Sequence, residues 1–173
     1  MLDARIPLAL AGAAQKKWIE TDPGQAWSKL LWADEDAGRW ASLLRWKKGY
    51  VAAPHVHLAD AHFFVLTGSI QVRDGVYGAG DYGYEPAGAV HGATTTLEDC
   101  VYFFLCNGPV RIDVDAAAGT PAYEIAVREI MAADAMAEAL ATNRASGGRR
   151  GGLRSAHGRC RARCGSPSRW SRA

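Results

Sequence analysis

The sequence predicts an all-β fold, a sandwich or a barrel, followed by a short helical segment. Between residues 26 and 115, short apolar runs alternate with glycines, which is the spacing of strands joined by tight turns. Beyond Pro121, alanines mix with long apolar side chains and favour a helix over Glu124–Leu140, interrupted at Asp134. Apolar residues make up 49% of the chain and charged residues 22%, as in globular proteins.

The apolar runs define the candidate strands. In chain order they are Ala26–Ala33, Trp40–Trp46, His62–Thr67, Ser69–Arg73, Val90–Thr96, Cys100–Cys106 and Val110–Val114. We expect residues 1–143 to form a single domain, a length that buries a real core. Cys100 and Cys106 lie among apolar residues and are interpreted as core thiols, whereas Cys160 and Cys164 are too isolated to build a zinc site.

Positive charge is concentrated at the C-terminal end of the chain. The formal net charge is +2, but residues 144–173 contain nine arginines and no acidic residue. Residues 1–143 hold the other eleven basic residues and all 18 acidic ones, a formal charge of −7 with neutral histidines. The Gly, Ser and Arg composition of 144–173 predicts a disordered basic tail. The basicity therefore gives no reason to expect a nucleic-acid partner.

The apolar runs are all short. None reaches the roughly 18 residues that a membrane-spanning helix needs. The stretch from Pro7 to Ala14 is short for a signal peptide, and Asp3 cancels Arg5 where a cationic segment should stand. We therefore expect a cytoplasmic protein with no membrane partner.

Four of the five histidines fall within the predicted β region, at positions 55, 57, 62 and 91. His55 and His57 are two residues apart, so on an extended chain both rings point to the same face. His91 follows a segment in which glycines and Pro86 supply a turn that brings the chain back. A cluster of imidazoles favours iron, zinc, copper or nickel over magnesium or calcium.

Two spaced motifs frame these histidines. Gly49-x5-His55-x-His57-x4-His62-x5-Gly68 resembles the first cupin motif, and Gly80-x5-Pro86-x-Gly88-x2-His91 is similar to the first part of the second. The resemblance covers roughly residues 26–115, with its motif core at 49–95. It implies a cupin jelly-roll β-barrel that holds an ion by His55, His57 and His91.

The motifs also depart from the cupin pattern. Ala61-His62 stands where the first motif usually has a glutamate ligand, and Thr95 stands where the second usually ends in Asn. A three-histidine site without the acidic ligand resembles the acetylacetone-cleaving dioxygenases and the dihydroxyacetophenone dioxygenase-like cupins. The most similar local segment is Tyr82–Thr94. The resemblance implies Fe2+, with Zn2+, Mn2+ or Ni2+ as alternatives, and O2-dependent cleavage of a C–C bond in a small β-diketone or hydroxyketone bound as its enolate.

Five further residues are expected at the site, and for Glu85, Arg73 and Thr94 the expectation comes from the resemblance. Glu85 is expected to be catalytic, orienting a ligand histidine or accepting a substrate proton, the alternative being a surface glutamate beside the turn at Pro86. Arg73 and Thr94 are expected on the substrate side of the cavity, although Arg73 equally fits an outward polar face. His62 is either a fourth ligand or a polar cavity wall. Phe63 is expected to contribute to an apolar pocket for the ketone.

Two other functions fit the same residues. One is a non-catalytic cupin in which the histidines hold zinc, as a sensor or binding module, and the other is a metal-dependent isomerase or hydrolase. A zinc sensor of the anti-sigma type would carry an N-terminal zinc-binding helical domain, for which we see no His/Cys pattern, so the enzyme is favoured. A homodimer or homotetramer is expected from large aromatic residues in the N-terminal half, namely Trp18, Trp27, Trp32, Trp40 and Trp46.

Overall fold

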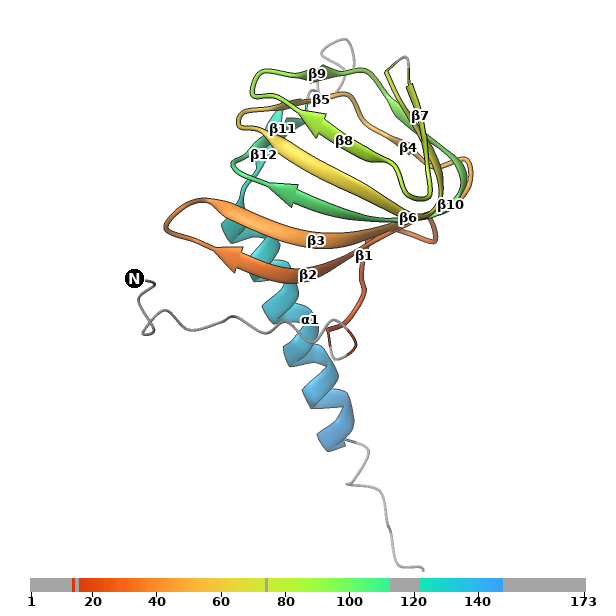
Figure 1. Cartoon of the computed structure of the whole chain (residues 1–173). Coiled ribbons are helices and arrows are strands. Elements are labelled where there is room, and N and C mark those ends of the chain that lie inside the picture. The colour runs from red at the N-terminus through yellow and green to blue at the C-terminus, as the bar shows by residue number, and fades with distance from the viewer. Residues whose placement is uncertain (1–13, 15, 74, 113–121, 148–173) are drawn as a thin grey trace, which may run out of the picture.

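Two antiparallel sheets enclose the interior of the molecule (Figure 1). The computed structural model describes residues 14, 16–73, 75–112 and 122–147. The large sheet has the order β1-β2-β3-β10-β6-β7, with β4 paired to β10 and β8 paired to β6, and the small sheet has the order β12-β11-β5-β9. The bounds are β1 Ile19–Asp22, β2 Ala26–Asp34, β3 Arg39–Trp46, β4 Val51–Ala52, β5 His55–His57, β6 Ala61–Val72, β7 Gly75–Gly78, β8 Tyr82–Glu85, β9 Val90–His91, β10 Thr94–Cys106, β11 Val110–Ile112, β12 Tyr123–Ile125 and α1 Val127–Gly147. The all-β prediction with one C-terminal helix is confirmed.

Two expected strands, His62–Thr67 and Ser69–Arg73, form one continuous strand, β6. Gly68 joins them at a positive φ of 73°. A β-carbon at this position would overlap the backbone oxygen of Asp99 on the neighbouring strand β10, so only glycine fits without a shift. The register between β6 and β10 is irregular here, as at a β-bulge.

The segment Val90–Thr96, expected as one strand, is divided between β9 and the start of β10. The division lets the two parts join different sheets, because β9 pairs with β5 and the start of β10 pairs with β4. It places His91 in the small sheet, directly opposite His55.

The helix begins later and ends later than predicted. Residues Tyr123–Ile125 pair with β11 as a strand, and α1 then runs to Gly147, into the segment expected as a tail. The remainder of that predicted tail, residues 148–173, lies outside the described residues. At the start of the helix the Ala126 N–H donates to the Glu129 carboxylate at 3.0 Å, which satisfies a free backbone donor. No helix in the described part of the chain has the length and apolar composition of a membrane span.

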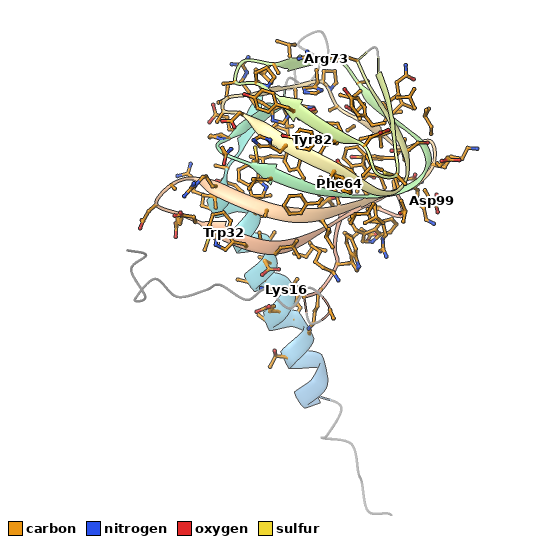
Figure 2. The ribbon with its side chains drawn as sticks, in the orientation of Figure 1. Lys16, Trp32, Phe64, Arg73, Tyr82 and Asp99 are labelled. Carbon is orange, nitrogen blue, oxygen red and sulfur yellow. The ribbon has the colours of Figure 1, made fainter. Side chains whose placement is uncertain are left out.

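Asp134 does not interrupt the helix. It is buried and accepts a hydrogen bond at 3.3 Å from the ammonium group of Lys16, which lies beside α1 in Figure 2. The expected break is wrong because this contact with the N-terminal segment compensates a carboxylate that would otherwise be buried without a partner.

The core consists of two clusters of buried residues. One includes Leu30, Trp40 and Val127, with Ile130 and Met131 of α1 packed against it, so the first turns of the helix cover one end of the barrel. The rest of α1 extends away from the strands (Figure 1). The second cluster includes Phe63, Val65, Ile70, Val72, Cys100 and Tyr102. Cys100 and Cys106 are buried free thiols, which confirms their prediction as core residues.

The alternation along β6 determines which of its side chains reach the interior. Ala61, Phe63 and Val65 are buried, whereas Phe64 and Leu66 are exposed on the outer face. Phe64 pairs with Tyr82 of β8, and both side chains lie on this outer face (Figure 2). The same period of two excludes His62 from the interior.

Candidate metal centre

Three histidines converge at the small sheet, as their spacing predicts. His55 and His57 lie on β5, and His91 lies on β9 directly opposite His55. One ring nitrogen from each of the three lies within 4.8 Å of those from the other two. The rings of His55 and His91 stack with centroids 4.6 Å apart, and the ring of His57 stands edge-on to both with centroids 5.0 Å away. This arrangement directs three nitrogen donors toward one point.

Two of the three histidines, His57 and His91, are buried and lack hydrogen-bond partners for their ring nitrogens. His57 is 1% exposed and His91 is 3% exposed, and both nitrogens of each ring have no hydrogen-bond partner among the described residues. Leaving a polar atom buried in this way costs about 1–3 kcal/mol. A bound divalent cation would satisfy one nitrogen of each ring.

His55 is held in the state that a metal ligand needs. Because a carbonyl oxygen only accepts, Nδ1 of His55 donates the 2.9 Å hydrogen bond to the carbonyl of Ala53, and Nε2 of the neutral ring keeps its lone pair. Burial lowers the pKa of His55 to about 4, so the ring is neutral near pH 7. The three histidines therefore fit a divalent transition metal.

Glu85 brings a carboxylate to the cluster. Its oxygens lie 2.9 Å from Nε2 of His57 and 3.0 Å from Nε2 of His91, although neither contact has the geometry of a directed hydrogen bond. Burial raises the pKa of Glu85, but the contacts with the two histidines outweigh burial and bring the pKa to about 2. The group is therefore a carboxylate at neutral pH. Its position next to His57 and His91 depends on the pairing of β8 with β6.

A cavity of about 310 Å³ adjoins the histidine cluster. Its wall is mostly apolar and aromatic, and Phe63 and Thr94 both line it. Gly83 lies opposite Phe63 on β8, and a β-carbon at Gly83 would overlap the phenyl ring. Glycine at this position thus leaves room for Phe63 in the wall.

His62 and Arg73 do not line the cavity. The Nδ1 atom of His62 lies 2.6 Å from the hydroxyl of Tyr82, and its Nε2 atom lies 3.2 Å from the carboxylate of Asp60. Both ring nitrogens therefore form hydrogen bonds with residues that do not line the cavity. Arg73 is exposed in the turn between β6 and β7, with a positive φ of 51° (Figure 2). His62 stands at an outward position of the β6 alternation, Arg73 follows the end of β6, and the structure does not bring either residue to the three histidines.

The fold and the site together define a cupin with a three-histidine cluster. More particularly, the profile of the ChrR cupin-like domain matches residues 8–111, and the chain belongs to this family. An acetylacetone-cleaving enzyme of Acinetobacter johnsonii is 27% identical over 97 residues, which are 53% of this chain and 63% of that enzyme. The match therefore spans less than two thirds of the relative.

Solved structures show the same fold. The crystal structure of an acetylacetone dioxygenase from Acinetobacter johnsonii superposes with a TM-score of 0.61 and 20% identity, over 77% of this chain and 93% of that one. The structure of an RmlC-like cupin protein from Ralstonia eutropha JMP134 superposes with a TM-score of 0.67 and 20% identity, over 75% of this chain and 85% of that one. These superpositions establish the cupin architecture.

Proposed function

We propose that this protein is a metal-dependent dioxygenase that cleaves a C–C bond of a small β-diketone or hydroxyketone bound as its enolate. One observation carries the proposal: the buried ring nitrogens of His57 and His91 lack hydrogen-bond partners and lie beside a carboxylate that lines an apolar cavity. Similarity to the acetylacetone-cleaving enzyme of Acinetobacter johnsonii supports this choice of substrate class.

His55, His57 and His91 would hold the ion, which we propose to be Fe2+, with Zn2+, Mn2+ or Ni2+ as alternatives. Such an ion supplies Lewis acidity toward the two oxygens of the substrate and, when it is iron, reactivity with O2. Neutral imidazole ligands leave the charge of the ion uncompensated, which favours an anionic enolate over a neutral ketone.

Glu85 would handle the proton that the substrate loses on becoming an enolate. The carbon between two carbonyl groups is acidic, and Glu85 provides a deprotonated carboxylate beside two of the ligand rings. Phe63 and Thr94 would form the wall against the bound substrate. Apolar surroundings exclude water and strengthen the attraction of the enolate to a cation.

The overall reaction balances without an external reductant. Breaking one C–C bond of a β-diketone with incorporation of both atoms of O2 gives one carboxylic acid and one α-dicarbonyl compound.

The proposal is tested by loading the protein with iron or with zinc and following O2 with an electrode while β-diketones and hydroxyacetophenones are added. We expect the iron protein to consume one O2 per acid formed. Absence of O2 uptake by the iron-loaded protein with all of these ketones would contradict the proposal.

The second candidate function is a non-catalytic cupin that holds zinc as a sensor or binding module. Membership of the ChrR cupin-like family is compatible with this second function. The fold and the three histidines do not by themselves separate binding from turnover. The same oxygen measurement distinguishes the two functions.

We further propose a cytoplasmic homodimer or homotetramer. An apolar surface for subunit contact is offered by the exposed side chains of Phe64, Leu66, Tyr82 and Tyr84.

A further inference from the structure

A second cavity lies on the outer face of the large sheet, and we call it the outer groove. Its volume is about 420 Å³, and its wall includes Trp27, Arg45, Lys47, Thr67, Asp99 and Val101. The outer groove and the cavity beside the histidines have only Trp46 in common among their lining residues. A ligand in the outer groove would therefore not touch the candidate metal ligands.

The strand register brings four of these side chains into one row. Trp27 of β2 lies opposite Arg45 of β3. Arg45 in turn lies opposite Val101 of β10, which pairs with Thr67 of β6. Both sequence neighbours of Arg45 line the inner cavity, so Arg45 itself faces outward. The row crosses four strands and forms one wall of the outer groove.

Arg45 has no counter-charge among the described residues. Its guanidinium carbon lies 4.7 Å from the centroid of the Trp18 ring and 4.5 Å from that of the Trp27 ring. Its Nε atom is buried without a hydrogen-bond partner, and no described residue forms an ion pair with this side chain. The indole rings attract and position the cation, but they do not accept its five N–H donors as an oxyanion would. The guanidinium is therefore held in place for an anion.

The other charges of the groove compensate each other. The ammonium group of Lys47 donates to the carboxylate of Asp99 at 2.6 Å, and the backbone N–H of Lys48 donates to the same carboxylate at 2.9 Å. These two hydrogen bonds lower the pKa of Asp99, so the group is negative at neutral pH. Two cations and one anion line the groove, and the excess positive charge is that of Arg45. A ligand with a single negative charge matches this balance better than a phosphate, which carries nearly two.

We infer that the outer groove binds a small organic monocarboxylate, whose carboxylate accepts hydrogen bonds from Arg45 and whose apolar part lies against Trp27 and Val101. A planar guanidinium suits a carboxylate, because it can donate two parallel hydrogen bonds to the two oxygens. The volume of the groove is within the range of small-molecule sites. The inference does not depend on any reaction at the three histidines.

The test measures binding of benzoate and of its uncharged counterpart benzamide by calorimetry. We expect benzoate to bind the wild-type protein at least about tenfold more tightly than benzamide, the size of one hydrogen bond to a charged group. In Arg45→Gln this preference falls to within about twofold. Arg39→Gln is the matched control and retains the preference. Arg39 also lies over a tryptophan, Trp32 at 5.8 Å, but it pairs with Asp34 and does not line the groove.

A gain of affinity guards against variants that fold poorly. Asp99→Asn removes the negative charge from the wall, and we expect it to bind benzoate about threefold more tightly than the wild-type protein. Unchanged or weaker binding by this exposed variant would overturn the inference. Equal affinity of the wild-type protein for benzoate and benzamide would overturn it as well.

Two further titrations identify the site and the ligand class. Metal-free and zinc-loaded protein should bind benzoate equally, because the outer groove contains none of the three histidines. Binding that requires zinc would place the carboxylate at the histidines and would overturn the inference. Inorganic phosphate should bind at least about tenfold more weakly than benzoate. Phosphate binding as tight as that of benzoate would overturn the assignment of an organic monocarboxylate.

Discussion

Ala61 and Glu85 lie directly opposite each other on the paired strands β6 and β8. Ala61 stands where the first cupin motif usually has a glutamate ligand, and it is completely buried. Paired residues of antiparallel strands project to the same face, so the side chain of Glu85 occupies the space that a longer residue at position 61 would fill. The carboxylate beside His57 and His91 therefore comes from the neighbouring strand instead of from the motif position.

Removing a ligand histidine should abolish metal retention. We expect His57→Ala and His91→Ala to lose the ion on dialysis, because two neutral donors on a buried wall no longer enclose it. Elemental analysis after dialysis measures this. His62→Ala is the matched control and should keep full metal content, since its ring nitrogens face Tyr82 and Asp60. Full metal content in both ligand variants would refute the assignment of the site.

Replacing Glu85 by glutamine should separate catalysis from metal binding. Glu85→Gln keeps the shape of the side chain but cannot accept a proton, so we expect kcat/KM to fall about 100-fold. Metal content should stay within about twofold of the wild type, because the three histidines remain. If the iron-loaded variant cleaved β-diketones at the wild-type rate, Glu85 would have no role in proton transfer.

Moving the carboxylate from β8 to β6 tests whether the side chains at positions 61 and 85 occupy the same space. In the double variant Ala61→Glu with Glu85→Ala, the carboxylate returns to β6 at the position opposite its present one. We expect this variant to retain metal at least as well as Glu85→Ala alone, measured by competition with a chromophoric chelator. Weaker retention than in the single variant would mean that the two positions do not share the same space.

The buried thiols should be unreactive in the native protein. Burial raises the pKa of Cys100 to about 11 and that of Cys106 to about 12, so both remain protonated at pH 8 and lack the reactive thiolate. In a Cys160→Ser and Cys164→Ser background, a disulfide reagent should titrate no thiol before denaturation and both thiols after it. Rapid reaction of the native protein at pH 8 would contradict the burial of this pair.

A comparison of Gly68 with Gly49 separates the cost of a positive φ angle from the cost of steric overlap with a neighbouring strand. Both have positive φ angles, 73° and 85°, but only at Gly68 would a β-carbon overlap the backbone of Asp99 and Cys100. We expect Gly49→Ala to lose about 1 kcal/mol from backbone strain and Gly68→Ala about 3 kcal/mol, measured as the free energy of unfolding in urea. Equal losses would show that the close approach of β6 and β10 at Gly68 adds nothing to the loss in free energy of unfolding.

Much of the site could be predicted from local spacing. The separation of His55 and His57 by one residue places both rings on one face, and the glycine and proline turn before His91 indicates a return of the chain. The alternation of buried and exposed residues along β6 would also have placed His62 on the outer face, and the alternation of polar with apolar residues from Ser69 onward favours an outward Arg73. For Arg73 the outward alternative was the one that the structure shows.

Other features depend on partners that are distant in sequence. The contact of Glu85 with two histidines follows from the pairing of β8 with β6. The helix was predicted to begin at Glu124, but Glu124 and Ile125 belong to the strand Tyr123–Ile125, because pairing with β11 outweighs local propensity. Local composition also does not indicate that the ammonium group of Lys16 donates a hydrogen bond to the buried carboxylate of Asp134 in α1.

The fate of the oxygen atoms tests the central claim most directly. Iron-loaded protein is supplied with a β-diketone under 18O2, and the carboxylic acid product is analysed by mass spectrometry. A dioxygenase places one labelled oxygen in each acid molecule, and the His57→Ala variant should form no acid. Hydrolytic cleavage on the same scaffold would instead give unlabelled acid under 18O2 and labelled acid in H218O. Labelled acid from the wild-type protein is the predicted result, and acid whose new oxygen comes from water would contradict the account.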